Sequence, residues 1–142
     1  MERMNEDFVG KMISHINKKD WWHCPPSDPY AYRKRGKFFA SSFREAEFWG
    51  RPLDVPQHVI VSNPLIGDED SIEVELFGHS VPKPRAGSAK ALEWRWKLDK
   101  RMKKAALTRG YDAIVLLTPN AFAACRQQSK IPRSIELNIL KP

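Results

Sequence analysis

The sequence predicts a single domain of the α+β class. Short runs of β-branched and aromatic residues, typical of strands, are mixed with segments whose apolar residues recur at helical spacing. These elements do not alternate regularly, as they do in a doubly wound parallel fold. A chain of 142 residues is long enough for one hydrophobic core. We therefore expect one domain over 1–142, with an N-terminal helix in 1–19 and the core in 20–142.

Helices are expected in three places. Asn5–Lys18 carries apolar residues at helical spacing. Ser42–Phe48 is a short helix that Gly50 stops. The clearest helix runs from Ser88 to Arg109 and is followed by a glycine. We expect this last helix to expose basic residues on most faces and to bury one stripe, consisting of Leu92, Trp96, Met102 and Ala106.

Strands are expected where short apolar or alternating runs end at turn residues. Ser71–Phe77 alternates aliphatic residues with Glu, which is typical of a half-exposed strand, and helix is the alternative there. The full set of expected strands is Asp20–Cys24, Phe38–Ala40, Gln57–Ser62, Ser71–Phe77, Tyr111–Leu117 and Arg133–Leu140. The connections are expected to be loops at Pro25–Lys37 and Val81–Gly87, an acidic turn at Gly67–Asp70, and irregular chain with an Ala-rich turn at Thr118–Ile131.

The composition indicates which class of partner and which cellular compartment to expect. A net charge of +7 favours an anionic partner such as a nucleic acid, a nucleotide or an acidic protein face. Cys24 and Cys125 give no disulfide framework, so we expect a reducing compartment, the cytoplasm. The longest apolar run, Ala113–Leu117, is too short to span a bilayer, and the first residues lack the apolar core of a signal peptide. We therefore expect no association with a membrane.

Motifs for metals and for phosphate-cradling loops do not occur. The histidines and cysteines lack the paired spacing of zinc ligands, so we expect no metal. The glycine patterns of the common nucleotide-binding loops are also missing. The basic helix Ser88–Gly110 and the basic loop Arg33–Lys37 are compatible with nucleic-acid binding, and a solvated helix face is the alternative interpretation.

The stretch Gly36–Gly50 offers the elements of a small-molecule pocket. An aromatic pair is followed by Ala and two Ser residues and then by a short amphipathic segment. Small residues let the backbone approach a ligand, and aromatic faces accept a flat one. The alternative is an ordinary strand, turn and helix with aromatic residues in the core.

Several segments, taken in order, resemble the ADP-ribosyltransferase superfamily in its histidine–tyrosine–glutamate branch, which includes poly(ADP-ribose) polymerases and diphtheria-type toxins. The first is similar to the family's first-strand His motif, the second to its Tyr-Phe-Ala motif with a later helix, and the last to its final-strand Glu motif. Two further segments are similar to small phage and toxin members. The three motif segments are, in that order, Trp22–Pro25, Phe38–Ser42 with Ala46, Phe48 and Trp49, and Ser134–Leu137. The two further segments are Val59–Leu65 and Gly110–Val115.

The resemblance implies a split β-sandwich with peripheral helices and NAD as substrate. It implies that Glu136 is the catalytic carboxylate and that His23 positions the adenosine ribose. Cys24 stands where the family's Gly grips the nicotinamide, and Phe38 stands where a Tyr is usual. The remaining residues expected to bind NAD are Ser41, Ser42 and either Phe48 or Trp49, which would sandwich the nicotinamide with Phe38. Phe39 is expected to pack on the opposite face of its strand.

A rival alignment lies within the same superfamily. Phe39–Ser42 is also similar to the Ser-Thr-Ser motif of the arginine–serine–glutamate branch. That branch has an Arg on the first strand, where this chain has His23, so we rank it second.

The expected function is that of an NAD-dependent mono-ADP-ribosyltransferase that modifies a macromolecular acceptor in the host cytoplasm. The resemblance implies a phage effector or a toxin, including the anti-defence or anti-CRISPR setting. The basic loop residues Arg33, Arg35 and Lys37 are expected to contact the NAD pyrophosphate or an anionic acceptor. The alternative is a non-catalytic basic protein that binds a nucleic acid or a nucleic-acid-binding complex.

Overall fold

The computed structural model describes residues 4–85, 87 and 89–142. The expected first residue of the basic helix, Ser88, lies outside these residues. In chain order, the helices and strands are α1 (Glu6–Lys18), β1 (Asp20–Trp21), α2 (Ala31–Arg35), β2 (Lys37–Ala40), α3 (Phe43–Ala46), the 3-10 helix η1 (Glu47–Trp49), β3 (Gln57–His58), β4 (Pro64–Gly67), α4 (Glu69–Phe77), α5 (Ala89–Thr108), β5 (Ala113–Leu116), α6 (Pro119–Gln128) and β6 (Glu136–Ile139).

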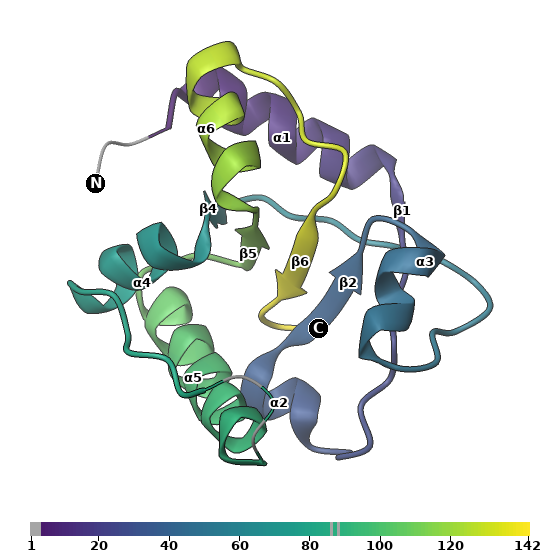
Figure 1. The fold of residues 1–142 in the computed structure, drawn as a ribbon. Helices are drawn as coiled ribbons and strands as arrows, with labels where there is room; N and C mark the ends of the chain where they lie inside the picture. The colour runs from purple at the N-terminus through teal and green to yellow at the C-terminus, as the bar shows by residue number, and fades with distance from the viewer. Residues whose placement is uncertain (1–3, 86, 88) are drawn as a thin grey trace.

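The central element is a four-stranded sheet with strand order β2-β6-β5-β4 (Figure 1). β6 is antiparallel to both of its neighbours, and β4 is parallel to β5. β1 and β3 form a second, two-stranded antiparallel sheet. Backbone hydrogen bonds between Trp22 and Ala40 connect the end of β1 to β2. This mixture of open sheets and helices confirms the α+β class.

Helices cover both faces of the four-stranded sheet. Successive side chains of a strand point to opposite faces of the sheet, so each strand contributes side chains to the packing on both faces. On one face α1 and α6 bury Phe8, Met12 and Phe122 against Val115 and Leu137. The other face packs against α4 and α5, whose buried side chains include Ile72, Leu98 and Met102. The packing of Phe39 in the first of these cores is as predicted.

The expected strand Ser71–Phe77 is wrong, because this segment belongs to helix α4. Asp68 caps the helix by accepting from the Ser71 backbone N–H, and the Ser71 hydroxyl accepts from the Asp68 N–H in return. Gly78 ends the helix in the left-handed conformation. The aliphatic residues alternate along this segment, but only Ile72 and Leu76, one helical turn apart, are buried, whereas Val74 is exposed.

Other boundaries also differ from the expectation. The region expected to be irregular after the fifth strand contains α6, which begins with a Thr118 cap and a proline in its first turn. The expected loop Pro25–Lys37 contains the short helix α2. Gln57–Ser62 is a strand only at its first two residues, and the chain instead forms β4 over Pro64–Gly67.

The stripe expected to be buried along α5 is correct only in its second half. Met102 and Ala106 are buried together with Leu98, whereas Leu92 and Trp96 are 55% and 46% exposed. The first half of the helix therefore does not pack as a core helix does. It forms one wall of a cleft.

Candidate functional site

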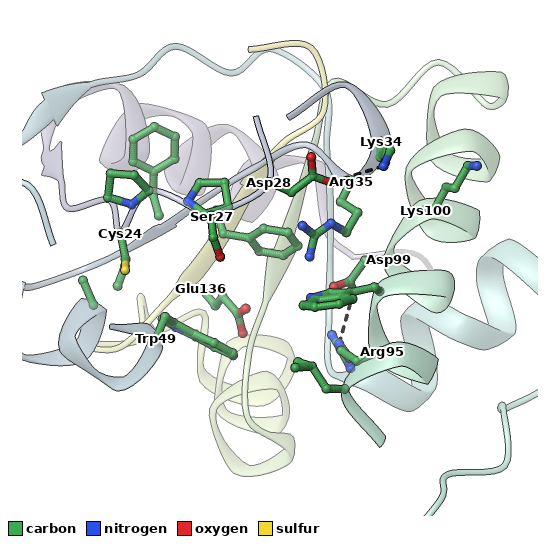
Figure 2. A pocket seen from close by; sticks show the side chains of 18 of the residues that line it. Cys24, Ser27, Asp28, Lys34, Arg35, Trp49, Arg95, Asp99, Lys100 and Glu136 are labelled. Carbon is green, nitrogen blue, oxygen red and sulfur yellow. Dashed lines mark hydrogen bonds and ion pairs between the residues drawn. The ribbon is translucent and has the colours of Figure 1, made fainter. Parts of the chain in front are cut away.

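A cleft of about 580 Å³ lies between β2, the α3–η1 segment and the first half of α5 (Figure 2). Its volume is within the range of sites that hold a small molecule. Apart from α5, the lining residues come from the segment that follows β1, from α2, from β2, from the α3–η1 segment and from the first residue of β6. The α5 wall consists of Leu92, Glu93, Arg95, Trp96, Lys97, Asp99 and Lys100.

Strand register places Glu136 at the base of this cleft. Glu136 is the first residue of β6 and lies opposite Ala40 of β2 and Leu116 of β5. Directly opposed residues share a face, so the Glu136 side chain points to the side of the sheet that α5 covers. Figure 2 shows its carboxyl between Trp49 on one side and Arg95 and Asp99 on the other.

The environment of Glu136 favours its protonated form. Burial raises the pKa of its carboxyl from 4.5 to about 7. The Arg95 guanidinium opposes this rise, whereas the carboxylates of Asp99 and Glu69 reinforce it and raise the pKa. A carboxyl with a pKa near 7 is partly ionised at neutral pH, so it can accept a proton or stabilise a positive charge.

Arg95 connects the cleft wall to the start of α4. Its Nη1 lies 2.5 Å from Oε1 of Glu69, and its Nε lies 3.1 Å from Oδ1 of Asp99, one turn further along α5. Burial raises the pKa of Asp99 to about 6, against the lowering effect of Arg95. The cleft therefore holds a second carboxyl that titrates near neutrality, and one arginine lies within the electrostatic reach of both.

The expected aromatic residues are only partly brought together. Phe38 and Trp49 both line the cleft, from β2 and η1. Phe48 is 82% exposed and is not among the lining residues, although its ring meets Trp49 edge-on at 5.0 Å. Of the two candidates for the second aromatic face, the geometry favours Trp49.

The structure does not bring His23 to the cleft. Trp22 and Cys24 line the cleft, and His23 between them is buried on the other side. Its Nδ1 lies 2.7 Å from the Phe38 carbonyl and its Nε2 lies 2.8 Å from the Tyr32 hydroxyl. Burial lowers the pKa of His23, so the ring is neutral at neutral pH. Because a carbonyl only accepts, Nδ1–H donates to Phe38 and Nε2 accepts from Tyr32.

Both expected serines have structural partners. The buried Ser41 hydroxyl donates to the Ile135 carbonyl at 3.0 Å and accepts from the Ile135 N–H at 2.7 Å. This pair holds the residue before Glu136 against the end of β2. Ser42 caps α3 by accepting from the backbone N–H of Glu45 at 3.2 Å. Neither serine is among the residues that line the cleft.

Cys24 does line the cleft, next to the segment that carries Trp49. Burial raises the pKa of its thiol, so the thiol stays protonated at neutral pH and is a poor nucleophile.

The basic residues expected to contact phosphate separate into two groups. Arg35 lines the cleft, with its guanidinium 5.1 Å from the centre of the Trp96 ring. Lys37 instead donates to the Gln57 side chain at 2.9 Å, and Arg33 is exposed outside the cleft. α2 ends directly after Arg35 at Gly36, whose φ is +89° and where a Cβ would collide with the Asn138 side chain.

The sequence-based prediction missed the α5 wall. Leu92, Arg95, Trp96 and Asp99 follow the spacing i, i+3, i+4, i+7 and therefore share one helix face. Two apolar members of this face suggested core packing, although the charged members between them indicate a face that is only partly buried. This helical spacing is visible in the sequence, but whether the face packs in the core or lines a cleft depends on where the helix crosses the sheet.

Within the described residues, no group of three or more His, Cys, Asp or Glu side chains is arranged to hold a metal ion. Likewise, no described helix is long and apolar enough to cross a membrane. Comparisons of the chain with protein-family models, curated proteins and solved structures found no match.

Proposed function

We propose that this protein is an NAD-dependent mono-ADP-ribosyltransferase with Glu136 as its catalytic carboxylate. The observation that carries the proposal is the placement of Glu136 in a nucleotide-sized cleft beside Phe38 and Trp49. The resemblance named Glu136, Phe38 and either Phe48 or Trp49, from segments that are almost a hundred residues apart in the chain. An ADP-ribosyltransferase-like arrangement of the two sheets is part of the same proposal.

The proposed reaction breaks the bond between the nicotinamide nitrogen and C1′ of the ribose. Nicotinamide leaves with the bonding electron pair, and the ribose acquires oxocarbenium character, as in glycoside hydrolysis. The Glu136 carboxylate stabilises this cation and hydrogen-bonds a ribose hydroxyl. An oxygen or nitrogen of the acceptor then bonds to C1′, and its proton is lost to Glu136 and from there to solvent. The products are ADP-ribosylated acceptor, free nicotinamide and one proton.

The surrounding residues have supporting roles in this proposal. Phe38 and Trp49 hold the nicotinamide ring between them, and Arg35 contacts the pyrophosphate. His23 acts indirectly, since its neutral ring ties the Phe38 carbonyl to the Tyr32 hydroxyl. It is a positioning residue for the β2 strand and does not contact the ribose.

The test measures nicotinamide release and transfer of labelled ADP-ribose from NAD to macromolecules of a cell lysate. Glu136→Gln keeps the shape of the side chain and removes the carboxylate, so both signals should fall by at least about a hundredfold. Glu6→Gln, an exposed substitution on α1, is the matched control and should behave as the parent. Label transferred equally by parent and Glu136→Gln, or by neither, refutes the proposal.

A second candidate function is a non-catalytic basic binding protein. It is favoured by one observation: both ring nitrogens of His23 already have protein partners, so the ring has no group left for a ribose. This function predicts tight binding of an anionic macromolecule with no release of nicotinamide from NAD. Calorimetric measurement of NAD binding to the Glu136→Gln variant separates the two candidate functions, because only a transferase should bind NAD in the cleft.

A further inference from the structure

The α5 side of the cleft combines exposed cations with an exposed aromatic ring. Lys97 and Lys100 of α5 and Lys34 of α2 are exposed and line the cleft. Figure 2 shows Lys34, Arg35 and Lys100 on the side of the cleft opposite Cys24 and Trp49. Trp96 lies on the same wall and is 46% exposed.

The positive charge of the chain is concentrated on this helix. α5 carries seven basic and two acidic residues, a net charge of +5 out of the chain's +7. α2 lies against it, because Lys103 donates to the Tyr32 carbonyl at 3.1 Å and also to the Arg33 carbonyl. The two helices therefore present one continuous basic surface, which reaches the cleft at Lys34 and Lys100.

The exposed lysines that line the cleft can exchange their present ion-pair partners for a bound anion. Lys34 pairs with Asp28 at 3.2 Å and Lys97 with Glu93 at 3.9 Å, with all of these side chains at least 38% exposed. Such pairs contribute little and are easily replaced by a phosphate. Lys100 has no ion pair among the residues that the structure describes. The surface can therefore bind an anionic chain without first losing buried interactions.

The stacked pair of Arg35 and Trp96 argues for a particular kind of anion. Unpaired bases stack on aromatic rings and on guanidinium planes, whereas acidic side chains have no flat apolar face to place there. Cations that follow a helix, next to an exposed aromatic ring, are the usual elements of a single-strand binding surface. An acidic peptide would use the cations but leave Trp96 without a contact.

We propose that the acceptor of the transfer is a single-stranded nucleic acid, whose phosphates lie along α5 and α2 and whose unpaired base stacks on Trp96 at the mouth of the cleft. This inference rests on the proposed function for the chemistry and on the basic surface for the acceptor. The base supplies the nitrogen or oxygen that bonds to C1′, and its proton leaves as described above.

The first test is direct binding without NAD, which is independent of any turnover. Fluorescence anisotropy of single-stranded DNA and RNA oligonucleotides of about 12 nucleotides measures the affinity of the full chain. Lys97→Glu with Lys100→Glu should weaken binding at least about tenfold and reduce the salt slope by about 1.4. Trp96→Ala should weaken binding about tenfold.

The matched control is Lys18→Glu with Lys130→Glu. It makes the same change in net charge at exposed positions outside the cleft, so it separates the position of the charges from their total. Equal weakening by both double variants overturns the proposed surface. Competition by polyglutamate as strong as that by an oligonucleotide of equal charge also overturns it, because an acidic protein would then be the better partner.

The second test follows labelled ADP-ribose from NAD onto the bound oligonucleotide. Label on the oligonucleotide, lost with Trp96→Ala, supports the acceptor assignment. Release of nicotinamide with label only on protein overturns the acceptor assignment and leaves the transferase standing. Oligonucleotide binding with no release of nicotinamide refutes the transferase, and with it the acceptor role of the strand.

Discussion

Glu136 should destabilise the fold at neutral pH, and its replacement by Gln should reveal by how much. Burial raises the pKa of its carboxyl from 4.5 to about 7, so the folded chain holds this proton more tightly than the unfolded chain does. The free energy of unfolding of the parent should therefore fall as the pH rises from about 4.5 to about 7. The difference between the two pKa values corresponds to about 3 kcal/mol.

The assay is urea unfolding of the parent and of Glu136→Gln between pH 4.5 and pH 8. Because Gln does not titrate, the variant lacks this contribution to the pH dependence. Its stability relative to the parent should rise with pH, by up to about 3 kcal/mol, and level off above pH 7. Glu6→Gln, at an exposed position, should stay within about 0.5 kcal/mol of the parent throughout.

The result also bears on function. A group that weakens the fold at working pH is a common feature of active sites, where stability is lost in favour of chemistry. If the parent and Glu136→Gln change in parallel across the whole pH range, the carboxyl titrates in the folded chain as it does in the unfolded one. Burial would then not raise the pKa of this carboxyl, and the expected pH dependence of the reaction would be refuted as well.

Three further predictions concern the cleft and one corrected helix. Nicotinamide release should rise with pH through about 7, because the carboxylate of Glu136 is the active form. Asp99→Asn removes a negative neighbour of Glu136 and should therefore move this rise in activity to lower pH. A pH profile of kcat/KM measures both effects. Trp49→Ala should raise the KM for NAD about tenfold, whereas Phe48→Ala, outside the cleft, should leave it within about twofold, in steady-state kinetics. Asp68→Ala should lower the free energy of unfolding by about 1 kcal/mol in urea titrations, and no change would contradict the capped helix α4.

Local patterns in the sequence predict some elements correctly and others wrongly. The amphipathic pattern of α1 and the buried run of β5 predicted both elements within about two residues. The sequence also contains the capping residues of α4, Asp68 and Ser71 at its start and Gly78 at its end, whereas the alternation of its aliphatic residues favours a strand. The capping residues Asp68, Ser71 and Gly78 are the stronger signal here, because alternation of aliphatic residues over seven positions also arises by chance on a helix.

The orientation of His23 could not be predicted from its neighbours. The run from Asp20 to Cys24 has aromatic residues at consecutive positions, so it has no alternation to show which side chains face the core. The pairing of Trp22 with Ala40 contributes to this orientation, which puts Cys24 into the cleft and His23 behind it. Pairing between strands far apart in the chain is tertiary information, which local patterns do not contain.

Helix α5 contributes both to the cleft around Glu136 and to the basic surface, and for this reason the sequence predicts only part of the site. One stripe of this helix is buried with Leu98 and Met102, a second lines the cleft with Arg95, Asp99 and Lys100, and a third exposes lysines outside the cleft, such as Lys104. A helix with three different faces shows a weak periodic pattern, because each face interrupts the others. The same arrangement lets one rigid element set the charge around Glu136 and present cations at the mouth of the cleft. A change in how α5 packs would therefore alter the environment of the carboxyl and the path of a bound strand together.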